Sequence, residues 1–497
     1  MLKPILLFII ISVVSIAPQA HSKEVGPALK KEQTITAQNL LARAGYDPGP
    51  VDGAYGKRTE AALMAFLKDN GYSFDGTLSD NELEILSKLP SSEKYRKRQR
   101  IAGNRPVKHT VRLVDGLVTF PDSWELPTYL SPPPDDIALE HYFYKWLSER
   151  PGGFVVEGSK QPTSLVINPI ENHYVGHQLK YNSVLSYILY EEGEVTIDQV
   201  APPDRFDRLT IDNATPFRSQ SVGKSVISYL VGHAICEGYI SGFDSSIDDW
   251  PLIKNTAYEN QKLIDLLNMR AGDQNIVNED VGFVSSGRWF NNRNKGIADH
   301  VNDEILGTKP DKKRIYNYNG FVTNILMNYV IFKTGDDWQQ FLDKVFQQHV
   351  RIEQDLVFMR SQINDADRGI GWYMFYATRY DYLRIAIAML QDWNSDTCMG
   401  DYLRYVYKNR GSKGGRAYRN SQNENSMAHY TKSYGGQFLL DFIGLEDRVI
   451  FGMEGHGGQN VLIDMDNARI VVINSAHTNM NWKNLAYEPL RTGTLPK

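Results

Sequence analysis

The stretch of sequence that decides the fold is Thr215-Pro216-Phe217-Arg218-Ser219-Gln220-Ser221-Val222-Gly223-Lys224-Ser225, with an apolar run to Ile235 behind it. The period of that run predicts a helix beginning at Ser221, which places Lys224 one turn on and on the same side. A serine hydroxyl attacks an acyl carbon only if a base takes its proton, and a lysine desolvated in an apolar pocket is neutral enough to do so. The helix N-terminus adds positive potential where an oxyanion forms. The stretch therefore predicts a nucleophile, Ser221, and its base, Lys224.

The spacing Ser-x-x-Lys alone is weak evidence, because it arises by chance about twice in a chain of this length. A second copy does occur, at Ser91 and Lys94, in a charged segment with no apolar helix behind it. The context of Ser221 therefore favours catalysis there. The alternative is an ordinary helix N-cap serine followed by a solvated lysine.

Length and composition indicate a well-cored protein of two folded parts. The chain has 497 residues, of which 42% are hydrophobic and 23% charged, and its formal net charge is −5. A chain of this length exceeds one typical domain. The negative balance gives no overall attraction to nucleic acid or to anionic membranes, so no nucleic-acid partner is expected.

Residues 1–22 have the pattern of a signal peptide: a basic position, an apolar run from Ile5 to Ile16, and small residues at Ala20 and Ser22. The run is too short to span a bilayer comfortably, so no stable membrane span is expected. We expect cleavage after Ser22 and a periplasmic or secreted protein; the alternative is an uncleaved anchor. Cys236 and Cys398 are too few for a disulfide framework, and the sequence leaves open whether they pair.

Residues 35–90 predict a compact three-helix unit with tight turns at Asp52-Gly53 and Gly56, and with Thr59 near the start of a helix, where its hydroxyl could cap. The unit resembles the peptidoglycan-binding domain of many cell-wall enzymes. The matching elements are Gly45-Tyr46, Val51-Asp52-Gly53-Ala54-Tyr55-Gly56-Lys57-Arg58-Thr59, Phe66 and Asp75-Gly76. The resemblance implies that peptidoglycan or its fragments are a partner; the alternative is a retained structural module.

Residues 91–136 are predicted to be a linker, basic at first and ending in Ser131-Pro132-Pro133-Pro134, where prolines favour an extended spacer. Residues 137–497 form the second domain. Its alternating pattern over Ser183–Ile197 predicts a β-hairpin, and two more strands are expected at Asn460–Ile463 and Ala468–Ile473. Strands near both ends with helices between them predict an α+β fold: an antiparallel sheet flanked by helices, with a helical subdomain.

The second domain resembles the serine β-lactamase and penicillin-binding-protein fold, in particular its class C and esterase-like branch, which also contains aminohexanoate-oligomer hydrolases. The resemblance spans about residues 183–475. It rests on Phe217–Asp249, which holds Ser221 and Lys224, on Leu266–Gly272, where Ala271 replaces a serine, and on Ile370–Ala386. It implies an acyl-enzyme mechanism on an amide or ester substrate.

The family also places a tyrosine near the serine, in a motif before a helix that ends at Thr-Gly. Counting back from Thr334-Gly335 assigns that role to Tyr318 and gives Tyr316 a preceding packing position. Tyr318 would relay the proton between Lys224 and the leaving group. At Gly320 the chain departs from the family, which has Asn or Ser there, so β-lactams are expected to react slowly.

A third family motif, on a strand beside the site, corresponds to the segment Gly455–Asn460. The resemblance implies that His456 contacts a substrate carboxylate or steadies the tyrosine. It also implies that the backbone N–H groups of Ser221 and Gln459 form the oxyanion hole. The further substrate-binding residues that it implies are Gly457, Gly458 and Tyr434. The alternative is a glycine-rich bulge with an incidental histidine.

No metal-binding, phosphate-loop or dinucleotide motif is found, so neither a metal nor a cofactor is expected. The sequence thus predicts an exported serine hydrolase associated with the cell wall, acting on a small amide or ester substrate. The alternatives are a catalytically silent peptidoglycan-binding protein of the same fold and a D-alanyl-D-alanine peptidase.

Overall fold

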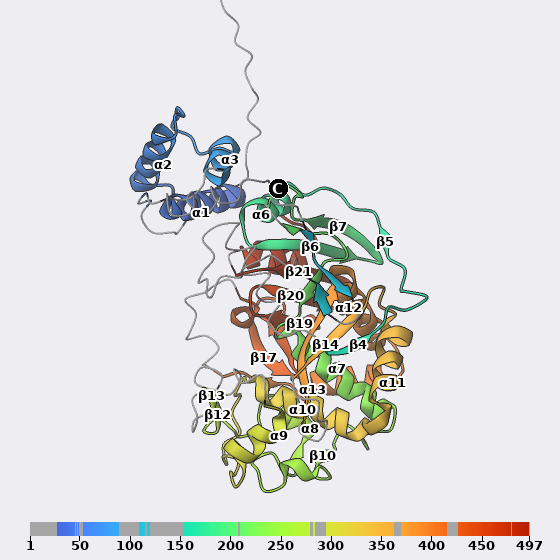
Figure 1. Ribbon diagram of the computed structural model, residues 1–497. Helices are drawn as coiled ribbons and strands as arrows, with labels where there is room; N and C mark the ends of the chain where they lie inside the picture. Colours follow the sequence, from blue (N-terminus) through green and yellow to red (C-terminus); the bar gives the residue numbers. More distant parts are fainter. Residues whose placement is uncertain are drawn as a thin grey trace, which may run out of the picture.

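The computed structural model describes residues 27–44, 46, 48, 53–88, 109–114, 117–119, 153–206, 209–278, 282–283, 295–361, 369–414, 426–478 and 480–496. The expected signal peptide, the second Ser-x-x-Lys copy at Ser91 and the proline-rich end of the linker lie outside these residues. Figure 1 shows a small helical module, coloured blue, beside a larger domain that runs from green to red.

The module consists of helices α1 (Pro27–Arg43), α2 (Lys57–Asp69) and α3 (Asp80–Lys88), so its first helix begins before the expected boundary at residue 35. The helices enclose a core of their own, made of Ala37, Leu41, Ala62, Leu63, Phe66, Leu67, Leu83 and Leu86. The expected capping role of Thr59 is wrong: Gly56 is the N-cap of α2, and the buried Thr59 hydroxyl donates to the carbonyl of Pro48 at 2.9 Å. Thr59 therefore fastens the loop between α1 and α2.

Helix α1 of the module lies against the larger domain, next to α6 (His173–Tyr181), as Figure 1 shows. The side-chain amide of Asn481 donates to Glu32 at 2.7 Å, and the Thr36 hydroxyl donates to Asn182 at 3.3 Å. Tyr181 packs on the module's apolar core. The two parts therefore share a polar and apolar contact.

The larger domain is built on a nine-stranded sheet in the order β16-β17-β18-β19-β20-β21-β6-β7-β5. The strands are β16 (Gly411–Ser412), β17 (Thr431–Gly435), β18 (Phe438–Phe442), β19 (Ile450–Gly455), β20 (Gln459–Asp464), β21 (Arg469–Ser475), β6 (Val184–Glu191), β7 (Glu194–Val200) and β5 (Val166–Ile167). The predicted hairpin is β6–β7, and β6 pairs antiparallel with β21, so the sheet joins the two ends of the domain as expected. The predicted α+β fold class is confirmed.

A second sheet, not anticipated from the sequence, has the order β4-β14-β15-β9. Its strands are β4 (Gly153–Val156), β14 (Leu356–Arg360), β15 (Gly371–Thr378) and β9 (Pro216–Arg218). Shorter pairs are β1 (His109–Thr110) with β8 (Leu209–Thr210), β2 (Arg112–Val114) with β3 (Leu117–Thr119), β10 (Ser246–Ile247) with β11 (Gln261–Lys262), and β12 (Val277–Asn278) with β13 (Gly282–Phe283). Through β1 and the buried Val111, part of the expected linker attaches to the larger domain.

The helices of the larger domain pack around both sheets. Besides α6 they are α7 (Val222–Cys236), α8 (Leu263–Leu267), α9 (Ile297–His300), α10 (Gly320–Thr334), α11 (Trp338–Asp343), α12 (Arg379–Trp393), α13 (Cys398–Lys408) and α14 (Glu488–Thr492). Shorter 3-10 and π-helical turns are η1 (Pro251–Ile253), η2 (Val301–Ile305), η3 (Gly335–Asp337), η4 (Lys344–Val350), η6 (Met427–Tyr430) and η7 (Lys483–Tyr487). None of the helices in the described part of the chain has the length and hydropathy needed to cross a bilayer.

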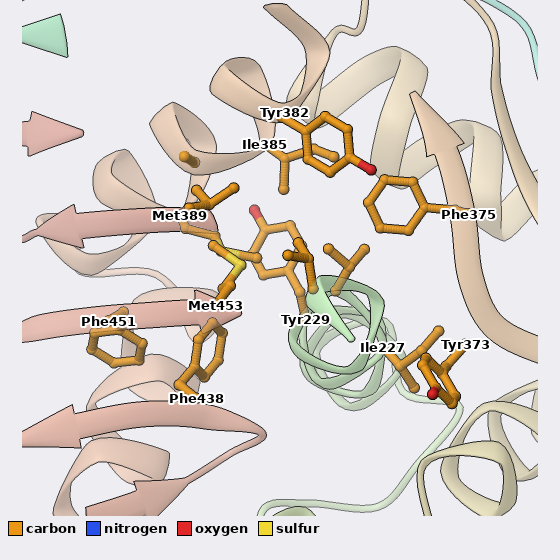
Figure 2. Close-up of a cluster of buried hydrophobic side chains, with 14 of the residues drawn as sticks. Ile227, Tyr229, Tyr373, Phe375, Tyr382, Ile385, Met389, Phe438, Phe451 and Met453 are labelled. Atoms are coloured by element: carbon orange, nitrogen blue, oxygen red, sulfur yellow. The ribbon is translucent and has the colours of Figure 1, made fainter. Parts of the chain in front are cut away.

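Helix α7 is the central core helix, buried from Val222 to Ala234. It is apolar on nearly every side, as a helix enclosed by other elements must be. Figure 2 shows it almost end-on, between Tyr373 and Phe375 of β15 on one side and side chains of the large sheet, such as Phe438, on the other. The segment quoted first therefore sits at the junction of the two sheets.

A disulfide joins Cys236 at the end of α7 to Cys398 at the start of α13, 162 residues apart. Closing so long a loop removes conformational entropy from the unfolded chain, by up to about 5 kcal/mol in the chain-entropy estimate. We expect the Cys236→Ser/Cys398→Ser double variant to unfold at a clearly lower urea concentration than the oxidised protein. Equal unfolding midpoints, with the bond verified by mass spectrometry, would contradict this role.

Candidate active site

Ser221 and Lys224 meet at the N-terminus of α7. The Lys224 amino group donates to the Ser221 hydroxyl, with Nζ 2.8 Å from Oγ. The lysine side chain is 0% exposed, whereas Ser221 is only half-buried and can be reached from outside. No cap hydrogen bond ties the Ser221 side chain to the helix backbone. The hydroxyl is therefore held by the lysine and remains available for attack.

The backbone ahead of the serine is fixed to β15. The backbone N–H of Ser219 donates to the carbonyl of Phe375 at 2.8 Å, and the N–H of Phe375 donates to the Ser219 hydroxyl at 2.9 Å. Between these contacts and the serine, Gln220 adopts a φ of +48°, a region that non-glycine residues enter at a cost. Such strain persists only where the surroundings enforce it, so the serine's position is strongly determined.

The glycine of the motif allows the helix to approach this strand. A Cβ on Gly223 would lie 2.1 Å from the carbonyl oxygen of Tyr373, which is far inside van der Waals contact. The motif Ser-x-Gly-Lys thus has a packing reason for its glycine, beyond the chemistry of the serine and lysine.

Two tyrosines surround the Lys224 ammonium. Its Nζ lies 4.4 Å from the ring centroid of Tyr318 and 4.5 Å from that of Tyr373. It also donates to the Tyr373 hydroxyl at 3.2 Å. Aromatic faces at this distance stabilise a cation, so the lysine can receive a proton at this place. Tyr318, expected from the sequence, lies beside the lysine, and Tyr373 is an addition that the sequence reasoning missed.

The loop that carries Tyr318 is pinned on both sides by one buried carboxylate, Asp273. The amide groups of Asn317 and Asn319 donate to Asp273 at 2.8 and 3.1 Å, and the Tyr258 hydroxyl donates to it at 2.7 Å. Burial raises the pKa of Asp273, while these donors pull that pKa down. Asn319 also caps α10 by accepting from the N–H of Val322. The two residues flanking Tyr318 are therefore immobilised by hydrogen bonds.

Tyr434, near the end of β17, packs its ring against two tyrosines of the same loop. Its ring centroid lies 6.0 Å from that of Tyr318 in an edge-on contact and 5.2 Å from that of Tyr316. The turn after Tyr434 brings in Gln437, whose side-chain oxygen accepts from Thr323 of α10 and whose carbonyl accepts from Ser225 of α7. Gln437 therefore connects the turn after Tyr434 to both helices, a role that was not predicted from the sequence.

The turn between β19 and β20 lies against the residues just before Ser221. A Cβ on Gly455 would fall 2.6 Å from the carbonyl oxygen of Ser219, and Gly455 pairs with Gln459 across the hairpin. The structure thus brings Gln459 to the neighbourhood of Ser221. Gly457 and Gly458 have φ values of +77° and +86°, which the turn requires. The Cβ position of Gly458 is occupied by Met480 at 2.7 Å, so that glycine faces protein rather than open space.

His456 is exposed at the tip of this turn and interacts electrostatically with Arg218. Its pKa is lowered, first by desolvation and second by the Arg218 charge. The pKa of His477 is lowered to about 4, by desolvation and then by His456. Both rings are therefore neutral at pH 7, whereas the buried Arg218 carries a permanent positive charge.

Of the expected site residues, the structure gathers Ser221, Lys224, Tyr318 and Tyr434, and it places the His456–Gln459 turn beside them. Tyr373 and Asp273 join the site although they are far away in the sequence. In the sequence Tyr373 is marked by its position in a strand-like aromatic run, Trp372-Tyr373-Met374-Phe375-Tyr376, but this run does not indicate Lys224 as its partner.

Known proteins resemble two parts of the chain. Residues 30–86 match the family model described as "Putative peptidoglycan binding domain". No curated protein matches the chain. Among solved structures, a protein described as "Putative 6-aminohexanoate-dimer hydrolase" from Bacillus anthracis is 14% identical with a TM-score of 0.47, covering 69% of this chain and 92% of that one.

Two further solved structures are similar in the same region. A class C β-lactamase from Rhodobacter sphaeroides is 14% identical with a TM-score of 0.42, covering 63% of this chain and 94% of that one. A penicillin binding protein from Bacillus halodurans is 13% identical with a TM-score of 0.46, covering 64% and 98%. The chain thus carries a module that matches a peptidoglycan-binding family, followed by an α+β domain similar to β-lactamase-like and penicillin-binding proteins.

Proposed function

We propose that the chain is an exported serine hydrolase that forms an acyl-enzyme at Ser221 and acts on an amide or ester bond of a cell-wall substrate. The observation that carries the proposal is the 2.8 Å contact between the Ser221 hydroxyl and a lysine that is 0% exposed. A lysine removed from water is the kind that can work as a neutral base at ordinary pH.

We assign the following steps, of which the contact between Ser221 and Lys224 and the two rings beside Lys224 support the first. The Ser221 oxygen attacks the acyl carbon while its proton passes to Lys224, and the resulting ammonium is stabilised by the faces of Tyr318 and Tyr373. The tetrahedral oxyanion is held by backbone N–H groups at Ser221 and Gln459. Tyr318 then passes the proton to the leaving amine or alcohol, and the acyl-enzyme forms. Water attacks the acyl-enzyme with Lys224 again taking the proton, which releases the acid and regenerates the serine.

The chemistry beside the site favours a substrate with a carboxylate near the bond that is cleaved. Arg218 is buried and permanently charged, and it lies close enough to His456 to lower the pKa of that ring. Peptides that end in a free carboxylate, such as peptidoglycan stem peptides, provide this group, which is also what a D-alanyl-D-alanine peptidase would need. Screening the purified protein against muropeptides, short esters and a chromogenic cephalosporin tests the substrate class.

Export and wall association are supported by two separate features. The Cys236–Cys398 disulfide suits an oxidising compartment outside the cytoplasm. The match of residues 30–86 to a peptidoglycan-binding family supports the wall-binding role.

The tyrosines around Lys224 are expected to contribute unequally. Tyr318→Phe removes the phenolic oxygen that we assign to proton relay, a loss of about 100- to 10,000-fold in kcat/KM. Tyr373→Phe removes one hydrogen bond that orients Lys224, which costs about tenfold and displaces the pH profile of kcat/KM. Tyr316→Phe keeps its packing ring and is the matched control, with a near-normal rate. A ranking in which Tyr316→Phe is the most damaging, measured on one ester, would overturn the assignment.

The module is expected to bind the wall without taking part in the chemistry. Because it has a core of its own, deleting residues 23–100 should leave most of the activity on small esters but weaken co-sedimentation with insoluble peptidoglycan. The truncation uncovers Tyr181, so the variant needs a check of its unfolding midpoint. Equal co-sedimentation of the full and shortened proteins would reject the binding role.

The remaining alternative is a catalytically silent wall-binding protein. The absence of a side chain at Gly320, the first residue of α10, is the one observation that favours it. Labelling with a fluorophosphonate or a fluorescent penicillin distinguishes the two, because only a reactive serine becomes covalently modified.

A further inference from the structure

Far from the serine, three side chains from separate elements converge on one point. They are His233 in the last turn of α7, His349 in η4 and Asp392 near the end of α12. One ligand atom from each lies within 4.8 Å of the others. We propose that these residues form a binding site for one divalent metal ion of the zinc type.

The buried ring of His233 has a nitrogen atom that lacks a hydrogen-bond partner among the described residues. This atom is Nε2, and the residue as a whole is only 6% exposed. Leaving a buried polar nitrogen unpaired costs about 1–3 kcal/mol, so such atoms normally have a partner. Burial also favours the neutral imidazole, which is the form that binds a metal.

The other two residues supply an access route and an anionic ligand. The Nε2 atom of His349 lies 3.0 Å from Asp392 Oδ2, and the His349 side chain is 40% exposed, so an ion can enter from solvent. Asp392 is buried and also accepts from the Tyr229 hydroxyl. A second hydrogen bond of this kind orients a metal-binding carboxylate. The Lys344 charge, which faces this group, is balanced by an ion pair with Glu237.

The donor atoms indicate the class of ion. Two imidazole nitrogens and one carboxylate oxygen suit zinc and its neighbours in the transition series, whereas calcium and magnesium prefer oxygen ligands throughout. Ligand atoms around a tetrahedral zinc lie on the order of 3.4 Å apart, given bonds of about 2.0–2.1 Å. Atoms now within 4.8 Å can reach that spacing by small side-chain rotations, with water as the fourth ligand.

The position defines a structural rather than a catalytic ion. His233 is 12 residues beyond Ser221 on α7, which at 1.5 Å per residue is about 18 Å along the helix axis. The ion would join α7 to η4 and α12, near the point where the disulfide joins α7 to α13. The sequence motifs gave no sign of this site because its residues lie on three different elements, His233 being 116 positions before His349 and His349 43 positions before Asp392.

The test is a Co²⁺ titration of the full, tag-free, chelator-treated protein, followed by displacement with Zn²⁺. We expect one equivalent of Co²⁺ to bind with the intense visible absorption of a four-coordinate site. His349→Gln, on the exposed side, should weaken binding by at least a hundredfold, and Tyr229→Phe by about 10- to 100-fold through the orientation of Asp392. His173→Gln, which alters an exposed histidine of α6, is the matched control and should bind normally.

Two readouts keep the proposal open to refutation. Zn²⁺ should raise the unfolding temperature of the normal protein and of His173→Gln but not of His349→Gln, since a ligand stabilises only the state that binds it. Absence of Co²⁺ binding, or equal binding by His349→Gln and the normal protein, overturns the site. Loss of binding in His477→Gln instead of His349→Gln would place the ion beside the active site and likewise overturn it.

Discussion

The Ser221→Ala variant is expected to lose covalent labelling by fluorophosphonates and to lose turnover of ester and amide substrates by about 10⁶-fold, as in enzymes whose nucleophile and base act as a unit. The fold should survive, because the Ser221 side chain caps nothing on α7 and is only half-buried. The measurements are intact-protein mass spectrometry after labelling and kcat/KM on a small ester.

Ser241→Ala is the control for this experiment, since Ser241 is exposed and its hydroxyl contacts the Ser245 hydroxyl. It should label and turn over normally. A Ser221→Ala protein that still acquires the label, with its circular dichroism unchanged, would show that another nucleophile does the chemistry.

The Lys224→Met variant is expected to fall by a similar factor, because the serine without its base is an ordinary alcohol. Methionine fills nearly the same volume, so the packing around α7 should be kept. The combined Ser221→Ala/Lys224→Met variant should be no worse than either single change, since the two residues serve one step. This non-additivity is measured as kcat/KM on the same ester.

Lys254→Met, at an exposed position, controls for the loss of a positive charge and should retain full activity. If Lys224→Met kept more than a few per cent of the normal rate, or if the double variant were far slower than both singles, Lys224 would be an electrostatic aid rather than the base.

The parts of the fold that were predictable from the sequence have strong local patterns. The alternation over β6 and β7 and the apolar runs of β20 and β21 identified a sheet built from both ends of the domain, and the structure pairs β6 with β21. The contact between Ser221 and Lys224 was equally predictable, because three residues on a helix bring two side chains together whatever surrounds them.

The parts that were not predictable depend on long-range packing. Strand β9 has three residues, too few to show a period, yet it holds the nucleophile segment against β15. Tyr373 meets Lys224 across 149 positions of sequence. The Asp273 network likewise joins residues 44 and 46 positions away. The role of Thr59 could not be predicted for the same reason. A threonine near the start of a helix caps it only if no nearby carbonyl competes for its hydroxyl, and here the carbonyl of Pro48 accepts that hydroxyl.

The contact between α1 and the larger domain, through Glu32 with Asn481 and Thr36 with Asn182, has a consequence for how the enzyme would meet its polymer. A hydrolase on a free tether samples every bond within the sphere that its linker allows, and the linker sets the effective concentration. When the module is docked on the larger domain, the distance between the point of attachment to the wall and Ser221 is instead constant. The bonds cut would then be those at one spacing and one orientation from each attachment point, so the pattern of products from an intact wall would be regular, whereas soluble fragments would be cut without preference.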